Sequence, residues 1–151
     1  MEFKIFDKDN VVNNIKYSVY DEPFVWISLS SPNRYSLLNA TNESLKDTLH
    51  LRFDDIEEDK QIWWEDFNRH LIPFTDEQAI EALEFVKKWK DEVNLIIVNC
   101  EAGVSRSSGL TMALSILING NDYNIKDNFH YKPNRLVVNK ILKFGNKVLY
   151  G

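Results

Sequence analysis

The stretch that decides the fold runs from residue 95 to residue 107 and reads LIIVNCEAGVSRS. Its first four residues are apolar and mostly β-branched, as in a buried strand of a parallel sheet. Next comes the only cysteine of the chain, Cys100, followed by a glycine, an arginine and hydroxyl side chains. A helical pattern then runs from Ser107 to Asn119 and is closed by Gly120. A strand, a polar loop and a helix in this order predict a loop that wraps an anion at the start of the helix.

The cysteine loop, residues 100–106, carries the side chains that phosphate-ester chemistry requires. A thiol must ionise before it attacks, and a helix N-terminus or a nearby cation favours the thiolate. Arg106 supplies a fixed cation whose planar fork matches two phosphate oxygens. Gly103 leaves room for the chain to curl its amides inward, and Ser107 can hydrogen-bond the sulfur. The pattern therefore predicts Cys100 as a nucleophile toward phosphorus. A buried cysteine that acts only as a small apolar residue leaves the other three residues unexplained.

The cysteine loop resembles that of the cysteine-based protein tyrosine phosphatase superfamily, and most closely that of its dual-specificity branch, whose loop reads His-Cys-x-Ala-Gly-x-Ser-Arg-Ser. The family's histidine, which orients the loop and helps to hold the thiolate, is replaced here by Asn99. An amide can hydrogen-bond but carries no charge, so we expect reduced activity or a shifted pH optimum. The matching positions are Cys100, Ala102, Gly103, Ser105, Arg106 and Ser107.

This resemblance implies a role for each residue of the loop. Cys100 would be the nucleophile and Arg106 the cation that binds the phosphate. Ser107 would help the sulfur to leave in a second, hydrolytic step. The residues expected to bind the phosphate are Glu101, Ala102, Gly103, Val104, Ser105 and Arg106.

The resemblance covers most of the chain. Residues 132–135, which read KPNR, and the apolar residues 136–142 are similar to the proline-asparagine turn and last helix of dual-specificity phosphatases. Phe24 to Leu29 resembles their early core strand, and residues 49–55, LHLRFDD, resemble the strand and loop that deliver the general acid. The implied fold is α/β: one domain over residues 1–151, with a central, mostly parallel sheet flanked by helices.

The position of the general acid follows from the same resemblance, which implies Asp55. Asp54 is the second candidate, and strand alternation predicts that the two side chains point to opposite sides. The chain between Asp55 and Cys100 is longer than is usual in the family, and the extra length lies within residues 56–75. Asp66, inside that extra length, is therefore a third candidate.

Two further features have alternative interpretations. Trp63 and Trp64 either divide between the core and the rim of the active site, or both anchor the extra segment to the body; we favour the second interpretation. Residues 33–35, Asn-Arg-Tyr, resemble the phosphotyrosine-recognition loop of larger tyrosine phosphatases. A match of three residues is weak evidence, so we favour an ordinary surface turn.

The three histidines lack metal-ligand spacing and are expected to be surface or core residues: His50, His70 and His130.

The composition sets limits on the class of protein. The chain has 151 residues, of which 44% are hydrophobic and 27% charged, as in a soluble globular domain. A net charge of −5 without a basic block disfavours nucleic acid or an anionic membrane as the partner. A single cysteine excludes an internal disulfide and favours the reducing cytoplasm. Residues 1–10 do not resemble a signal peptide, and no apolar run approaches the ~20 residues of a membrane span. We expect a monomer.

The remaining elements follow from local patterns. Glu2–Phe6 and Ile15–Tyr20 are predicted as short strands joined by a polar turn around residues 7–10. Phe24–Ser30 is predicted as a buried strand, and residues 36–45 as ambiguous, with a short helix as one option. Apolar alternation over residues 49–53 predicts another strand. Thr75 and Gln78 form the capping box of a helix whose apolar residues are Ala79, Ala82, Leu83, Val86 and Trp89; the last helix has Leu136, Val137, Ile141, Phe144 and Val148.

These features favour one function over several alternatives. The expected enzyme is a protein-tyrosine or dual-specificity phosphatase that acts on a phosphorylated protein or peptide, without metal or cofactor. Glu101 and Val104 leave the loop without a lysine, which argues against inositol polyphosphates. A phosphate-binding module without turnover is favoured only by Asn99. The acidic balance disfavours an RNA 5′-phosphatase. The loop match and the proline-asparagine turn disfavour a rhodanese-like sulfurtransferase.

Overall fold

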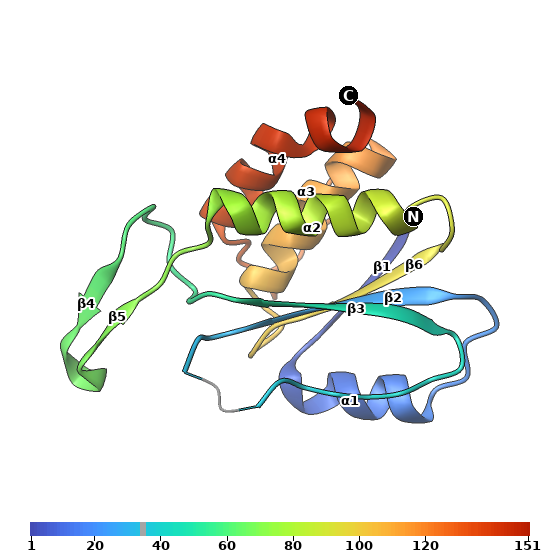
Figure 1. Cartoon of the computed structure of the whole chain (residues 1–151), viewed down its shortest axis with the longest axis horizontal. Helices are drawn as coiled ribbons and strands as arrows, with labels where there is room; N and C mark the ends of the chain where they lie inside the picture. The colour runs from blue at the N-terminus through green and yellow to red at the C-terminus, as the bar shows by residue number, and fades with distance from the viewer. Residues whose placement is uncertain (34–35) are drawn as a thin grey trace.

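The centre of the computed structural model, which describes residues 1–33 and 36–151, is a parallel sheet (Figure 1). Its four strands lie in the order β1-β6-β2-β3, and every neighbouring pair is parallel. The strands are β1 (Glu2–Phe6), β2 (Phe24–Ser30), β3 (Leu45–Arg52) and β6 (Leu95–Asn99). The predicted α/β fold with a mostly parallel sheet is therefore confirmed.

Helices cover both faces of the sheet. Helix α1 (Lys8–Tyr17) lies on one face, and α2 (Asp76–Trp89), α3 (Arg106–Asn119) and α4 (Arg135–Tyr150) lie on the other (Figure 1). Alternate residues of the central strands supply the two cores, so that Trp26 packs on the α1 side and Ile27 on the opposite side. Burial on both faces explains why β2 and β6 are apolar along their whole length.

The predicted strand over Ile15–Tyr20 is wrong, and so is the polar turn around residues 7–10. Residues 7–10 form the N-cap and first turn of α1, because the Asp7 side chain accepts a hydrogen bond from the Asn10 backbone N–H and caps the helix. Val11 and Ile15, four residues apart, are fully buried against the sheet. The apolar pattern in this segment is therefore helical, with few enough members to be read as a short strand.

Residues 36–45, for which the sequence predicts no definite element and a short helix is one option, contain no helix, and Leu45 already begins β3. Asn42 organises their end: its side-chain amide donates to the carbonyls of Ile15 and Ser18, and its oxygen accepts from the Ser44 N–H. A polar side chain that satisfies backbone groups of α1 competes with helix formation in its own segment. Of the residues 33–35, Arg34 and Tyr35 lie outside the described residues.

The helix signals in the second half of the chain are confirmed. The Thr75 hydroxyl accepts from the Gln78 N–H, and the Gln78 side chain accepts from the Thr75 N–H, which is the predicted capping box of α2. Gly120 ends α3 with a left-handed φ of 78°. Helix α4 follows the Lys132–Arg135 turn as expected. These signals are local, which is why they could be identified without tertiary information.

The extra segment between residues 56 and 75 forms a hairpin. Strands β4 (Ile62–Trp64) and β5 (Arg69–Leu71) pair with each other, joined by the short helix η1 (Glu65–Phe67), and the hairpin extends away from the body (Figure 1). Trp63 is 52% exposed and packs edge-on against His70, while Trp64 is 38% exposed and packs on Phe67. The favoured interpretation, that both tryptophans anchor the segment to the body, is wrong: they contact residues of their own hairpin.

None of the helices formed by residues 1–33 and 36–151 combines the length and the apolar character that crossing a bilayer requires.

Candidate active site

The cysteine loop lies where the carboxyl ends of the parallel strands meet. Cys100 directly follows β6, the second strand in the sheet order, and the loop leads into α3. The ends of β1 and β2 flank it, since Phe6 and Ser28 are both paired with Asn99. This edge is the usual place for a ligand in an open parallel sheet, because the helix that follows each strand starts there.

Cys100 and Ser107 are close neighbours inside the protein. The Cys100 Sγ lies 3.0 Å from the Ser107 Oγ, and the two residues are 3% and 0% exposed. The hydroxyl can donate to a sulfur anion, and the first turn of α3 adds the positive end of a helix dipole. The structure therefore brings these two predicted residues together.

Gly103 is required by both its conformation and its surroundings. Its φ is +67°, and a Cβ added there would lie 3.0 Å from the Asp7 nitrogen and from the Phe6 carbonyl carbon. The same part of the loop is tied to α1, because the Lys8 N–H donates to the Glu101 carbonyl and the Lys8 ammonium lies 3.2 Å from the Glu101 carboxylate. No local pattern of residues indicated that the start of α1 packs against the cysteine loop.

Arg106 is held by residues that follow β2 and β3, at the carboxyl ends of these strands. It is only 5% exposed, and its Nη1 donates to the Phe53 carbonyl at 2.8 Å and to the Ser31 hydroxyl at 3.1 Å. The Phe53 ring lies beneath the guanidinium, 6.0 Å from Cζ to the ring centroid. These contacts fix the direction of the planar guanidinium at the base of the loop, as two-point binding of a phosphate group requires.

The N-cap residue of α3, Ser105, makes an unusual bond. Its side chain does not cap the helix; the hydroxyl donates instead to Asp55 Oδ1 at 2.8 Å. The first turn of a helix has N–H groups without intrahelical partners, and this one has no side-chain cap. Such a terminus presents its donors to an anion.

Asp55 links the cysteine loop to the last helix. Its Oδ1 also accepts from the side-chain amide of Asn134 at 2.8 Å, and that amide donates to the Ile56 carbonyl as well. Asn134 is the N-cap of α4, so the proline-asparagine turn noted in the sequence reaches the candidate acid. Gly109 allows this approach, because a Cβ there would lie 2.8 Å from the Asn134 carbonyl oxygen.

Asp54 points elsewhere, as strand alternation predicts. Its carboxylate accepts from both terminal nitrogens of Arg69, at 2.8 and 3.0 Å, and from the Ile72 N–H at 2.8 Å. Burial raises the pKa of Asp54. The hydrogen bonds from Arg69 and Ile72 and the charges of Arg69 and Arg106 lower it by more, so the pKa lies below its ordinary value. The third candidate, Asp66, is exposed in η1 at the tip of the hairpin.

Asn99, which stands where the family has histidine, is buried and bonded on both sides of its amide. Its Oδ1 accepts from the Trp26 indole N–H at 2.8 Å, and its Nδ2 donates to the Cys100 carbonyl at 3.4 Å. The amide thus orients the start of the loop from the core of the sheet, without a charge.

The sequence profile described as protein-tyrosine phosphatase matches residues 31–133. The chain belongs to the protein-tyrosine phosphatase family. No curated protein matches it. Solved structures do, at low identity, and they show that the fold of this phosphatase-family chain is that of a tyrosine phosphatase.

The first of these structures is the human tyrosine phosphatase-like serine/threonine/tyrosine-interacting protein, with 14% identity and a TM-score of 0.61 over 97% of this chain and 93% of that one. PTPMT1 in complex with PI(5)P matches at 16% identity with a TM-score of 0.54, and the match covers 97% of this chain and 88% of that one. Tk-PTP in its active form matches at 12% identity with a TM-score of 0.53, and the match covers 96% of this chain and 90% of that one.

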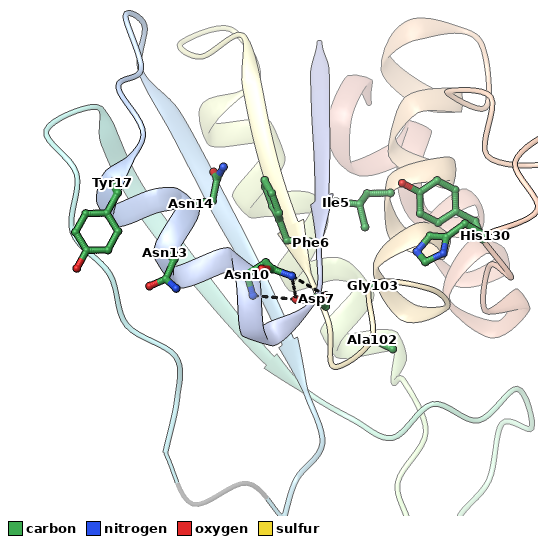
Figure 2. Close-up of a pocket in the computed structure, with 11 residues that line it drawn as sticks. Ile5, Phe6, Asp7, Asn10, Asn13, Asn14, Tyr17, Ala102, Gly103 and His130 are labelled. Carbon is green, nitrogen blue, oxygen red and sulfur yellow. Dashed lines mark hydrogen bonds between the residues drawn. The ribbon is translucent and has the colours of Figure 1, made fainter.

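A cavity of about 670 Å³ opens beside the cysteine loop of this phosphatase-family chain (Figure 2). Ala102 and Gly103 line it together with α1, which contributes Asn10, Asn13, Asn14 and Tyr17, and with His130 and Tyr131 from the α3–α4 connection. The sequence interpretation assigned no site role to α1 or His130. The local signals for α1 were the Asp7–Asn10 cap and the helical spacing of Val11 and Ile15, and nothing local indicated that His130 comes close to the loop.

The other two histidines lie away from the loop. His50, on β3, packs edge-on against Trp26, and burial together with the Arg52 charge lowers its pKa. His70 packs on Trp63 in the hairpin. Among residues 1–33 and 36–151, histidine, cysteine and carboxylate side chains form no group of three that could hold a metal ion.

Proposed function

We propose that this chain is a phosphatase that hydrolyses phosphotyrosine, and also phosphoserine and phosphothreonine, in proteins or peptides through a cysteinyl-phosphate. Family membership supports the phosphatase class. One observation supports the mechanism most: the Cys100 sulfur lies 3.0 Å from the Ser107 hydroxyl, in a loop whose Ser105 is bonded to Asp55. Cys100 and Ser107 thus lie side by side, and Asp55, from the segment that follows β3, is bonded to the same loop through Ser105, as the proposed roles of nucleophile, leaving-group stabiliser and acid require.

In the first step the Cys100 thiolate attacks phosphorus. The backbone amides of residues 101–106 and the Arg106 guanidinium bind the equatorial oxygens, whose charge they stabilise in the transition state. The S–P bond forms as the P–O bond to the substrate breaks. The Asp55 carboxyl group transfers its proton to the leaving oxygen, so the alcohol or phenol departs neutral.

In the second step water attacks the cysteinyl-phosphate. The Asp55 carboxylate accepts a proton from the water while the S–P bond breaks. Ser107 donates a hydrogen bond to the sulfur, which leaves as a thiolate, and inorganic phosphate is released. No cofactor takes part in either step. We assign the reaction to one catalytic domain over residues 1–151, acting as a monomer in the cytoplasm.

The alternative is a phosphate- or phosphoprotein-binding module without turnover. Two observations favour it: Asn99 stands at the family's histidine position, and one of the similar structures is described as a tyrosine phosphatase-like interacting protein. Such a module would use the same loop for binding, so sequence similarity does not separate the two functions.

Turnover of para-nitrophenyl phosphate by the purified chain tests the proposal. We expect vanadate-sensitive hydrolysis that is lost in Cys100→Ser, because the hydroxyl is a far weaker nucleophile than a thiolate. The control is Ser115→Ala. Ser115 is a buried serine in the last part of α3 that bonds Asn121, and its loss should leave turnover unchanged. Turnover that persists in Cys100→Ser overturns the mechanism. Binding of vanadate without turnover in the wild type supports the module.

A further inference from the structure

The hairpin holds the segment that contains the candidate acid through one ion pair, here called the Arg69–Asp54 clamp. Arg69, the first residue of β5, places both terminal nitrogens on the Asp54 carboxylate, at 2.8 and 3.0 Å. The backbone adds a bond from the Asp54 N–H to the Ile72 carbonyl at 2.7 Å. A two-point guanidinium–carboxylate contact fixes orientation as well as distance.

The clamp acts on a segment, residues 53–55, whose three consecutive residues are held by side chains of α3 and its N-cap, of β5 and of the N-cap of α4. The Phe53 carbonyl accepts from Arg106, the Asp54 carboxylate from Arg69, and the Asp55 carboxylate from the Ser105 and Asn134 side chains. The peptide unit that joins residues 54 and 55 is planar, so a change of ψ at residue 54 turns that whole unit and moves the Cα atom that carries the Asp55 side chain. The clamp therefore bears on the direction of Asp55 and on the carbonyl that orients Arg106.

The burial of the pair separates it from an ordinary surface ion pair. The side chains of Asp54 and Arg69 are 6% and 24% exposed, whereas those of Lys60 and Glu58, a pair in the same connection, are 73% and 64% exposed. Within the described residues, β4 and β5 form a sheet of their own and do not pair with the central sheet. The clamp thus links the hairpin to the acid segment, and its partial burial protects the two charges from screening by water more than those of Lys60 and Glu58.

We propose that Arg69 is a positioning residue for the general acid and acts through Asp54. The clamp holds the acid segment so that Asp55 faces the cysteine loop, and the long insertion exists to supply this arginine from outside the central sheet. Neither Arg69 nor Asp54 touches the substrate. This inference rests on the proposed function, because it gives the insertion a role in the same proton transfer.

Substrates with different leaving groups can distinguish a role of Arg69 in positioning the acid from a role in stability alone. Phenyl phosphate has a basic leaving oxygen and needs the proton; an aryl phosphate with a strongly acidic phenol needs it much less. We expect Arg69→Gln to lower kcat/KM for phenyl phosphate about tenfold, part of the 10²–10⁴ that general acid catalysis supplies; kcat/KM reports the first step alone, before the cysteinyl-phosphate that all substrates share. For difluoromethylumbelliferyl phosphate the loss should stay below about twofold. A purely structural role predicts equal losses for both substrates.

Three further variants sharpen the result. Lys60→Gln removes a cation from the same connection without touching the acid segment, and should leave both substrates unaffected. Arg69→Lys keeps the charge but not the two-point contact, and should fall between wild type and Arg69→Gln. In Arg69→Gln/Asp54→Asn the loss should equal that of one single variant, since both changes break one contact. Additive losses, or equal losses for both substrates, overturn the proposal.

A readout independent of turnover keeps this inference distinct from the proposed function. The Asn134 side-chain amide is buried and donates to Asp55, so its ¹H–¹⁵N resonance reports the position of that carboxylate. The resonance should shift in Arg69→Gln and stay in place in Lys60→Gln. If the wild type lacks turnover, the proposed function fails while the NMR comparison still tests the clamp. An unmoved Asn134 resonance in Arg69→Gln contradicts the positioning claim even in an active enzyme.

Discussion

The indole N–H of Trp26 donates a 2.8 Å hydrogen bond to the side-chain oxygen of Asn99, the residue before the cysteine. Both residues are 1% exposed, so this bond joins the buried centre of β2 to the start of the cysteine loop away from water. It shows how the loop is oriented without the family's histidine. A neutral amide takes the position, and the core of the sheet supplies its partner.

Removing this amide should destabilise the protein. Asn99→Ala leaves the buried Trp26 N–H without an acceptor, and we expect the free energy of unfolding to fall by about 1–3 kcal/mol in urea titrations. The control is Asn94→Ala, one residue before the same strand, where an exposed side chain bonds Glu22; its cost should be below about 0.5 kcal/mol. Equal costs at the two positions contradict this account.

Gly103→Ala should be worse than the same change at the other glycine with positive φ. Gly120 has φ +78° and open space around a Cβ, so Gly120→Ala costs only the left-handed strain of about 1–2 kcal/mol. Gly103→Ala adds a collision with the backbone of Phe6 and Asp7, for about 1–3 kcal/mol more. Urea titration of the two variants gives both values. Similar losses would mean that the loop can move away from α1.

The three candidate acids should rank in a fixed order on phenyl phosphate. Asp55→Asn should lower kcat by about 10²–10⁴ and remove the alkaline limb of the pH profile, because Asp55 is the candidate acid whose carboxylate is bonded to Ser105 of the cysteine loop. Asp54→Asn should give the intermediate loss expected from the clamp. Asp66→Asn should change kcat by less than about twofold, since the residue is exposed in η1 at the tip of the hairpin. A larger loss at Asp54 than at Asp55 reverses the assignment.

Ser107→Ala should slow the second step more than the first. The hydroxyl 3.0 Å from the sulfur stabilises the departing thiolate, and a hydrogen bond to a charged group is worth roughly a 10- to 100-fold change in rate. Rapid-mixing experiments should then show a burst of phenol followed by slow turnover, as the cysteinyl-phosphate accumulates. Ser115→Ala on the same helix serves as the control. The absence of a burst, with slowed phenol release, places the effect of Ser107 in the first step.

Acid should destabilise the wild type partly through Asp54. Because the folded state lowers the pKa of this carboxyl group, its contribution to stability is complete above the unfolded pKa of about 3.9 and is lost as the pH falls through the lower, folded value. Urea titrations from about pH 7 to about pH 3 should show a smaller loss of stability in Asp54→Asn than in the wild type. Arg69→Gln should reduce the same pH dependence, since it removes the main partner. An unchanged pH dependence in both variants argues against the clamp as a stabilising contact.

The features that the sequence predicted correctly are those that depend on neighbouring residues. Residues 95–107 read as strand, loop and helix because burial on both faces makes β6 apolar and because an anion loop needs a glycine and an arginine near the cysteine. The capping box at Thr75 and the helix end at Gly120 are bonds between residues a few positions apart, so their partners are visible in the sequence.

The features that the sequence missed are those in which distant residues satisfy one another. Residues 15–17, the end of helix α1, were predicted as part of a strand because α1 has only a few buried residues and the sheet that they contact is distant in the sequence. The tryptophans of the hairpin pack on their own hairpin rather than on the body, and the bonds of Asp54 to Arg69 and Ile72 join this segment to residues 53–55.

The sequence by itself determined the nucleophile loop, the parallel α/β fold and a choice among three acids. Only the tertiary structure decided how Asp54 and Asp55 differ in their partners: Arg69, on the hairpin, binds the first, while Ser105 and Asn134 bind the second. The physical reason is that two adjacent carboxylates have the same chemistry along the chain. They become different only when burial and partners from separate elements give each its own direction and its own electrostatic environment.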